Sequence, residues 1–128
     1  MKTFASFSLS IILTLLLFNS CKKSTTEVQV QYKIDPVDSY IIQINYTDQS
    51  GQLKTIDNIS QIQNGTETIQ VTQIPFTATL DVKVNNNTNA SRNYNLLIYI
   101  DGQVKSWSSF TAPPMTSLSE KQIEYIIN

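Results

Sequence analysis

The acidic side chains are the groups in this sequence with the clearest capacity for chemistry. Among 128 residues there are ten Asp and Glu, one cysteine and no histidine. Histidine is the commonest general base and metal ligand in proteins, so a hydrolase built from this chain would have to work without it. Asp35 and Asp38 could contribute to a calcium site, but the other ligand positions of such a loop are missing. We therefore expect Asp35-x-x-Asp38 to form a turn.

Other signatures of chemistry are also missing from the sequence. No serine stands in a nucleophile elbow, and no glycine-rich loop could hold a phosphate. The single cysteine, Cys21, allows neither a disulfide framework nor a thiolate metal cluster. Nine Lys and Arg nearly balance the acidic residues, which gives no electrostatic footprint for nucleic acid. We expect a protein without catalytic residues, metal or cofactor that does not bind nucleic acid.

Residues 1–20 are expected to be a signal peptide rather than part of the fold. Lys2 supplies a positive charge, and residues 4–18 follow as an uncharged, mostly apolar run of fifteen residues. A helix needs about 20 apolar residues to span a bilayer, so this run is too short for a transmembrane anchor. The composition turns polar directly after Cys21.

The sequence around Cys21 resembles a bacterial lipoprotein signal, in which the cysteine thiol is acylated and becomes the first residue of the mature protein. Ser20 is the small residue before the cysteine, and Cys21-Lys22-Lys23 is similar to the start of many Bacteroidetes lipoproteins. The resemblance implies stable anchoring by several acyl chains. Because Lys22 rather than aspartate follows the cysteine, it also implies the outer membrane, on its periplasmic or surface face. The alternative is an unmodified thiol beside an ordinary signal peptide.

Beyond a polar tether at residues 21–26, apolar and polar residues alternate along most of the chain. Alternation with period two predicts strands that bury one of their faces. Turn-forming pairs such as Asn64-Gly65 and Asp101-Gly102 separate these runs. The expected strands cover residues 28–34, 40–46, 52–58, 67–73, 76–84, 94–100, 103–110 and 121–127.

Seven or eight short strands at spacings of about ten residues predict an all-β domain over residues 27–128. The fold class that this spacing favours is an immunoglobulin-like antiparallel β-sandwich. The one helical alternative is residues 117–126, where Ser119 could cap a helix, but the β-branched and aromatic end of this segment favours a strand. A domain of this size buries roughly two-thirds of the surface of its unfolded chain, so it needs no disulfide to fold.

The hairpin over residues 94–110 predicts which side chains face outward. A loop of odd length, Ile100-Asp101-Gly102, puts Ile98 on the same face as Val104. A two-residue loop would instead place Lys105 beside Ile98 on the core side and bury its charge. We therefore predict the odd loop. The outer face of the hairpin then holds Leu97, Tyr99, Lys105 and Trp107.

Leu97, Tyr99 and Trp107 form the candidate interaction patch. Aromatic anchors dominate the energetics of protein interfaces, so an exposed group of this kind predicts a binding surface. Two other interpretations stay open. The three side chains could be covered within the domain, or they could serve only to stabilise the hairpin by cross-strand pairing.

Three runs of the sequence share a pattern of short strands and turns: Val30-x-Tyr32 with Ile42-x-Ile44-x-Tyr46-Thr47-Asp48-x-x-Gly51, then Phe76-x-x-x-Leu80-x-Val82-x-Val84-Asn85, and Ile98-Tyr99-Ile100-Asp101-Gly102. Together they resemble the small mycobacterial membrane protein family called MmpS. The resemblance implies a β-sandwich that is exported from the cytoplasm, and a role as accessory to a large resistance-nodulation-division transporter. The paired cysteines of that family are missing here, and a lipoprotein signal stands where its transmembrane anchor would be.

Together these observations predict a non-enzymatic lipoprotein of the bacterial envelope that acts through protein–protein contact. Its partners would be the membrane, through the lipid on Cys21, and an envelope protein. The resemblance implies that this envelope protein is a transporter. The alternative is a binding module for carbohydrate or another small ligand at the cell surface. The sequence does not define the oligomeric state.

Overall fold

The computed structural model describes residues 25–61 and 63–128, so the expected signal peptide and Cys21 lie outside the described residues. The described part contains eight strands and two short 3-10 turns, η1 (Ile59–Gln61) and η2 (Gln63–Gly65). The strands are β1 (Val28–Asp35), β2 (Ile41–Thr47), β3 (Leu53–Ile56), β4 (Thr66–Val71), β5 (Phe76–Asn86), β6 (Arg92–Ile100), β7 (Gln103–Ala112) and β8 (Thr116–Ile127).

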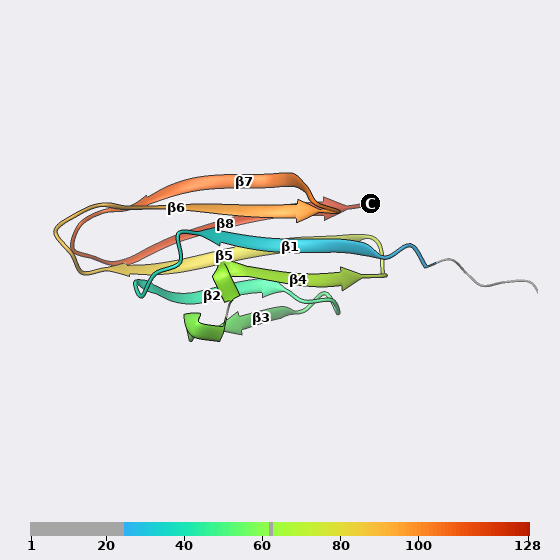
Figure 1. Cartoon of the computed structure of the whole chain (residues 1–128), viewed down its shortest axis with the longest axis horizontal. Coiled ribbons are helices and arrows are strands. Elements are labelled where there is room, and N and C mark those ends of the chain that lie inside the picture. Colours follow the sequence, from blue (N-terminus) through green and yellow to red (C-terminus); the bar gives the residue numbers. More distant parts are fainter. Residues whose placement is uncertain (1–24, 62) are drawn as a thin grey trace, which may run out of the picture.

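The eight strands form two antiparallel sheets of four strands each (Figure 1). Sheet A has the order β4-β1-β6-β7, and sheet B has the order β3-β2-β5-β8. The β6–β7 hairpin of sheet A therefore stands in the chain between β5 and β8, which pair with each other in sheet B. This architecture confirms the predicted antiparallel β-sandwich, and residues 117–126 lie in a strand rather than a helix.

The core consists of alternate side chains from both sheets. On β5, the residues Phe76, Ala78, Leu80, Val82 and Val84 are all buried, as the alternating sequence predicts. Sheet A contributes the facing side chains, including the fully buried Val30, Leu96 and Ile98. Burial of apolar surface at about 25 cal/mol per Å² makes this layer the main source of stability.

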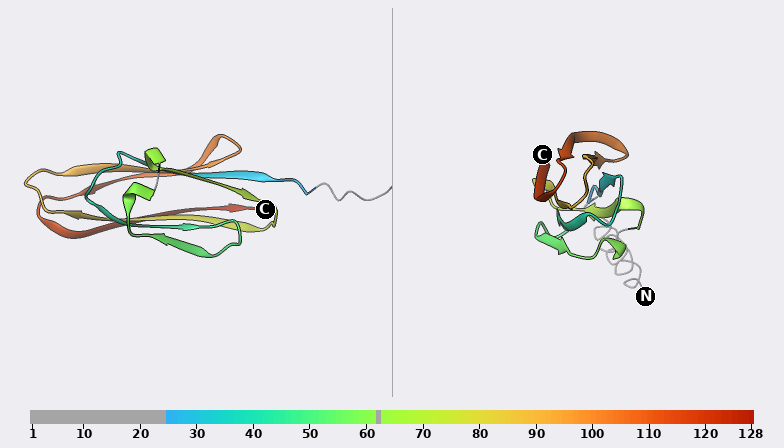
Figure 2. Two further views of the ribbon diagram at one scale, coloured as in Figure 1. Left: turned by 60° about the horizontal axis from the view of Figure 1, so that its bottom comes forward. Right: turned by 90° about the vertical axis from the view of Figure 1, so that its left-hand side faces the viewer.

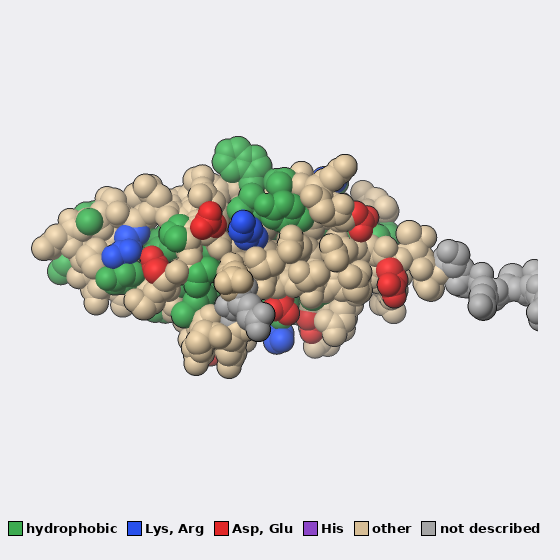
Figure 3. All heavy atoms as spheres, viewed as in Figure 1, with side chains coloured by type: hydrophobic (Ala, Val, Ile, Leu, Met, Phe, Trp, Pro, Cys, Tyr) green, Lys and Arg blue, Asp and Glu red, His purple; other side chains and the backbone are tan. Residues whose placement is uncertain are grey.

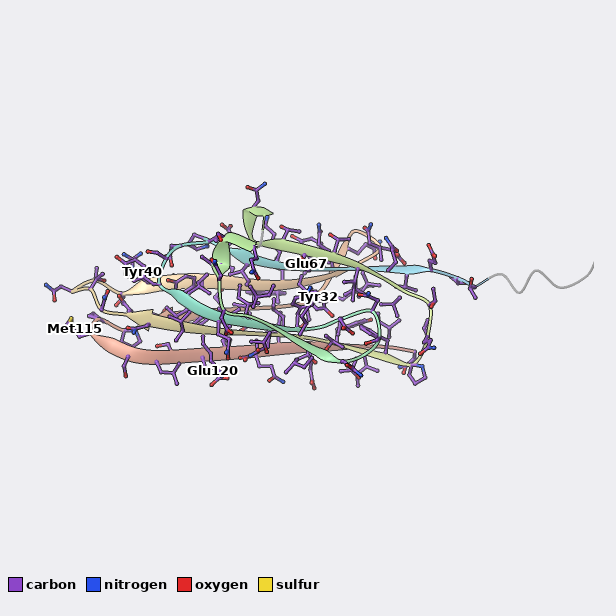
Figure 4. All side chains as sticks on the ribbon, turned by 90° about the horizontal axis from the view of Figure 1, so that it is seen from below. Tyr32, Tyr40, Glu67, Met115 and Glu120 are labelled. Atoms are coloured by element: carbon purple, nitrogen blue, oxygen red, sulfur yellow. The ribbon has the colours of Figure 1, made fainter. Side chains whose placement is uncertain are left out.

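Tyrosines close the side of the sandwich at β3 and β4. The Tyr32 hydroxyl donates to the Thr47 carbonyl across the two sheets at 2.8 Å, and the Tyr46 hydroxyl donates to Glu67 Oε1 at 3.2 Å. The Lys54 ammonium lies 5.6 Å from the centre of the Tyr46 ring. Figure 4 shows Tyr32 and Glu67 near the middle of the molecule. Hydrogen bonds from buried phenols thus tie the two layers together on this side.

One end of the sandwich is formed by the β5–β6 and β7–β8 loops, which lie side by side (Figure 2). Asn86 joins them, and its side chain has no exposed surface. Its Nδ2 amide donates to the carbonyls of Ala90, Ala112 and Pro113 at 2.8–3.0 Å. We call this end the distal pole, and Figure 4 places Met115 there.

The structure corrects the predicted strand boundaries at the distal pole. The expected strands end at residue 84 and resume at residue 94, but β5 continues to Asn86 and pairs with β8 as far as Thr116. The last strand was expected near 121–127 and is instead twelve residues long. The reason is that Asn86 is buried although it is polar, because its side chain makes five hydrogen bonds. A pattern of apolar residues alone therefore ends the strand too early.

Asp38 lies in the connection between β1 and β2, where a turn was predicted. Its Oδ1 accepts the backbone N–H of Tyr40 at 3.0 Å, and the Tyr94 hydroxyl donates to both carboxylate oxygens at 3.0 Å. Arg92 completes the group with an ion pair to Asp38 at 3.3 Å and stacks on the Tyr40 ring at 3.6 Å. The carboxylate therefore has a structural task, since it anchors a buried phenol and a stacked guanidinium.

Gly65 is a position where only glycine fits, and replacing it should cost more than replacing Gly102. Both glycines have positive φ, 67° and 80°. A Cβ on Gly65 would collide with Val37 Cγ2 and the Ile34 carbonyl, whereas nothing lies within 4 Å of a Cβ on Gly102. We predict that Gly65→Ala lowers the free energy of unfolding by about 3 kcal/mol and Gly102→Ala by about 1 kcal/mol, measured by urea denaturation. Equal losses would contradict this packing.

The buried tyrosines predict a loss of stability at alkaline pH. Burial raises the pKa of Tyr32, of Tyr46 and of Tyr94, for which the bond to Asp38 adds to the effect. Unfolded tyrosine ionises near pH 10. Stability is therefore unaffected by these groups below pH 10 and falls above it, by about 1.4 kcal/mol per pH unit for Tyr32 alone. A thermal midpoint that stays constant between pH 9 and pH 11.5 would rule this out.

Candidate functional site

The candidate patch lies on the outer face of sheet A, where β6 and β7 pair. Leu97 pairs directly with Trp107, and Tyr99 pairs directly with Val104. Directly opposed residues of an antiparallel pair share a face, and so do residues two apart along a strand. The structure thus brings the three predicted residues together and adds Val104. We call Leu97, Tyr99, Val104 and Trp107 the sheet A patch.

The patch is open to solvent chiefly through β7. The Trp107 side chain is 68 % exposed and Val104 is 44 % exposed, while Leu97 and Tyr99 are partly buried. Figure 3 shows hydrophobic side chains standing out from the surface along the upper edge, where Figure 1 places β6 and β7. The interpretation that Trp107 is covered within the domain is therefore wrong.

The loop that sets this register is not the one predicted. Ile100 pairs with Gln103, so the loop contains only Asp101 and Gly102, both with positive φ (49° and 80°). Two such residues make a type I′ turn, whose twist suits a hairpin better than a longer loop does. The predicted odd loop was therefore wrong.

A β-bulge supplies the odd residue that the loop does not. The pairing shifts between Ile98 and Tyr99, which leaves Lys105 as the extra residue of β7. A two-residue loop was expected to bury the charge of Lys105. It does not do so, because Lys105 is exposed at the bulge. Val104 consequently shares the face of Tyr99 rather than that of Ile98, and Lys105 is not a regular member of the outer face. The orientation of Trp107 agrees with the prediction because the bulge restores the expected parity.

Uncharged polar side chains flank the patch toward the distal pole. The Ser109 hydroxyl donates to Asn95 Oδ1 at 2.8 Å, and the Thr111 hydroxyl donates to Asn93 Oδ1 at 2.7 Å. Each Asn lies on β6 directly opposite its hydroxyl partner on β7. Because Oδ1 is the acceptor in both pairs, the Nδ2 amides remain as donors on this face.

The neighbouring strand β1 brings charge to the rim of the patch. Lys33 is the direct partner of Leu97, Gln31 of Tyr99 and Asp35 of Asn95. The described residues contain two ion pairs, Lys83–Glu120 and Arg92–Asp38, and neither includes a residue of the patch or of β1. Lys33 and Asp35 are therefore the charges on β1 closest in register to the patch.

The outer face of sheet B carries a different polar group. Asn45 donates through Nδ2 to Asp81 Oδ2 at 2.7 Å and accepts the Thr55 hydroxyl at 2.8 Å. Asp81 is 6 % exposed, and its Oδ1 has no hydrogen-bond partner among the described residues. No group of three His, Cys, Asp or Glu that could hold a metal ion occurs within residues 25–61 and 63–128. Asp35 and Asp38 are thus not joined there by a third acidic ligand.

Comparisons with protein-family models and with curated proteins find no match to this chain. In the part of the chain that the structure describes, no helix is long and apolar enough to cross a membrane.

Proposed function

We propose that this chain is a non-enzymatic lipoprotein of the bacterial cell envelope that acts through protein–protein contact at the sheet A patch. The observation that carries the proposal is Trp107, which is 68 % exposed in the middle of β7. Leu97 and Val104 enlarge the apolar surface around the indole. An exposed indole on an apolar base, with a polar rim, is the composition of an interface centre.

Structural stabilisation alone accounts poorly for this arrangement. A cross-strand pair such as Leu97 and Trp107 contributes at most about 1 kcal/mol to a sheet. Serine and threonine fill the neighbouring outward positions of β7 at Ser109 and Thr111 without loss of pairing. An exposed Trp on the same face of β7 as these small polar residues therefore favours a role in binding a partner.

The family resemblance adds a class of partner to this proposal, an envelope transporter that the protein would assist. The alternative function is carbohydrate binding on the same face. The observation in its favour is the pair of Asn amides, Asn93 and Asn95, beside an exposed indole, because sugars are bound by amide donors and aromatic rings together. In either case the lipid on Cys21 would hold the domain at the outer membrane, facing the periplasm or the cell surface.

The contact proposal predicts that Trp107→Ala removes partners. The full-length protein, solubilised with its envelope in mild detergent, should co-purify with proteins that the variant loses, because removal of an anchor residue typically costs 2 kcal/mol or more of binding. Leu53→Ala is the matched control, since Leu53 is 61 % exposed on β3 of the other sheet. An identical set of co-purified proteins in wild type and Trp107→Ala, together with a wild-type protein that is monomeric, would refute the role of the patch.

The anchoring proposal predicts the behaviour of Cys21→Ala. Without acyl chains the protein should move from the membrane fraction to the soluble fraction after cell lysis, because one residue carries all the anchoring lipid. Mass spectrometry of the wild-type N-terminal peptide provides an independent readout of the modification. Membrane association that persists in Cys21→Ala, together with an unmodified wild-type peptide, would show that the cysteine is an ordinary thiol.

A further inference from the structure

The outer face of sheet A is complementary to itself. It combines the apolar sheet A patch with one cation, Lys33, one carboxylate, Asp35, and two free amide donors, Asn93 and Asn95. Amides can both donate and accept hydrogen bonds, and an ammonium group is attracted both to carboxylates and to the face of an indole. Each kind of group on the face therefore finds a suitable partner within the same set.

The position of β1 restricts how two copies could use this face on one membrane. Val28 begins β1 at the pole opposite the distal pole (Figure 1). Val28 is the seventh residue after Cys21, which gives a reach of about 25 Å at most. If both copies are anchored by Cys21 in one bilayer, their β1 strands must start from the same side. A two-fold axis for face-to-face packing must then run parallel to the strands.

We infer that the partner bound by the sheet A patch is a second copy of this chain, packed face to face about a two-fold axis along β6. The inference rests on the proposed function, since it names the partner of the same surface. Two sheets that pack face to face lie about 10 Å apart, with their strands within about 30° of each other. Closed two-fold symmetry is also the commonest form of self-association.

The observed register fixes which residues meet across this axis. Sheet A has the order β1-β6-β7 around β6, so a rotation about β6 places β7 of one copy over β1 of the other. Leu97 and Tyr99 lie on the axis and meet their own copies. Trp107 meets Lys33 of the second copy, because both are aligned with Leu97 in the sheet.

The contacts between Trp107 and Lys33 occur twice by symmetry and place an ammonium group against each exposed indole. Asp35 is aligned with Asn95 and Ser109, so it meets this pair in the second copy. The Nδ2 amide of Asn95 can then donate to the carboxylate. In this arrangement each Lys33 contacts an indole and each Asp35 contacts an amide of the other copy. The two Trp107 side chains, which are exposed in the single chain, become covered.

Cysteine cross-linking in native membranes tests the axis directly. A residue on a two-fold axis is close to its own copy, so full-length Leu97→Cys should give a covalent dimer with a short bis-maleimide reagent. Tyr99→Cys is a second variant on the axis, in case Leu97→Cys does not fold. The controls are Leu53→Cys, at a more exposed position in sheet B, and the wild type, with Cys21 as its only cysteine. No dimer from folded Leu97→Cys and Tyr99→Cys beyond the level of both controls would overturn the inference.

A charge variant tests the contact between Trp107 and Lys33. Lys33→Glu removes both ammonium groups from the indoles and should weaken self-association about tenfold, measured by sedimentation of the detergent-solubilised protein. Lys105→Glu makes the same charge change at the bulge, outside the matched pairs, and should leave self-association unchanged. Equal effects of the two variants would show that net charge, not this contact, controls association.

The same experiments separate this inference from the proposed function. A monomer whose Trp107→Ala variant still loses co-purified proteins would overturn the second copy as partner and leave the contact function intact. Trp107 is the only tryptophan in the sequence, so tryptophan fluorescence reports on this face. If the protein is a monomer and cellohexaose or maltohexaose quenches this fluorescence, the face binds carbohydrate rather than a second copy. A monomer that shows neither effect would refute both proposals.

Discussion

The structure depends on one constraint, that alternate side chains of eight strands must fit between two sheets. β5 illustrates it best, since its inward residues are buried from Phe76 to Val84 while it pairs with β2 on one side and β8 on the other. Once this layer is formed, the remaining alternate positions must face solvent. The outer faces of sheets A and B are thus consequences of the core.

Polar residues close the sandwich where the apolar layer ends. Asn86 joins the loops of the distal pole, Asp38 holds Tyr94 and Arg92, and Tyr46 reaches Glu67 at the β3 and β4 side. Each of these groups is buried or partly buried and hydrogen-bonded, as burial of polar atoms requires. These contacts close the sandwich without a disulfide in the described residues, and none of them uses the sheet A patch.

The sequence was sufficient to predict the fold class, most strands and the outward orientation of Trp107, because alternation reports burial directly. It was not sufficient for Asn86 or Asp38, whose roles depend on carbonyls and hydroxyls far away in the chain. It also misplaced Lys105 and Val104. A hairpin loop of two residues with a bulge and an odd loop without one give the same orientation at Trp107, so parity at one residue could not distinguish them. Asp101-Gly102, a strong signal for the shorter loop, was the usable hint.

The bulge at Lys105 has a consequence for how this hairpin can change during evolution. In a regular strand, gain or loss of one residue would move every later side chain to the opposite face of the sheet. Trp107 would then face the core, and Phe110, which now faces the core, would face outward. Here one residue is already outside the alternation, so the hairpin holds a spare position next to its turn. A shortened β7 could be realigned by giving up that position, with the indole still turned to the surroundings. The outward orientation of the indole is in this way protected against the loss of one residue near the turn.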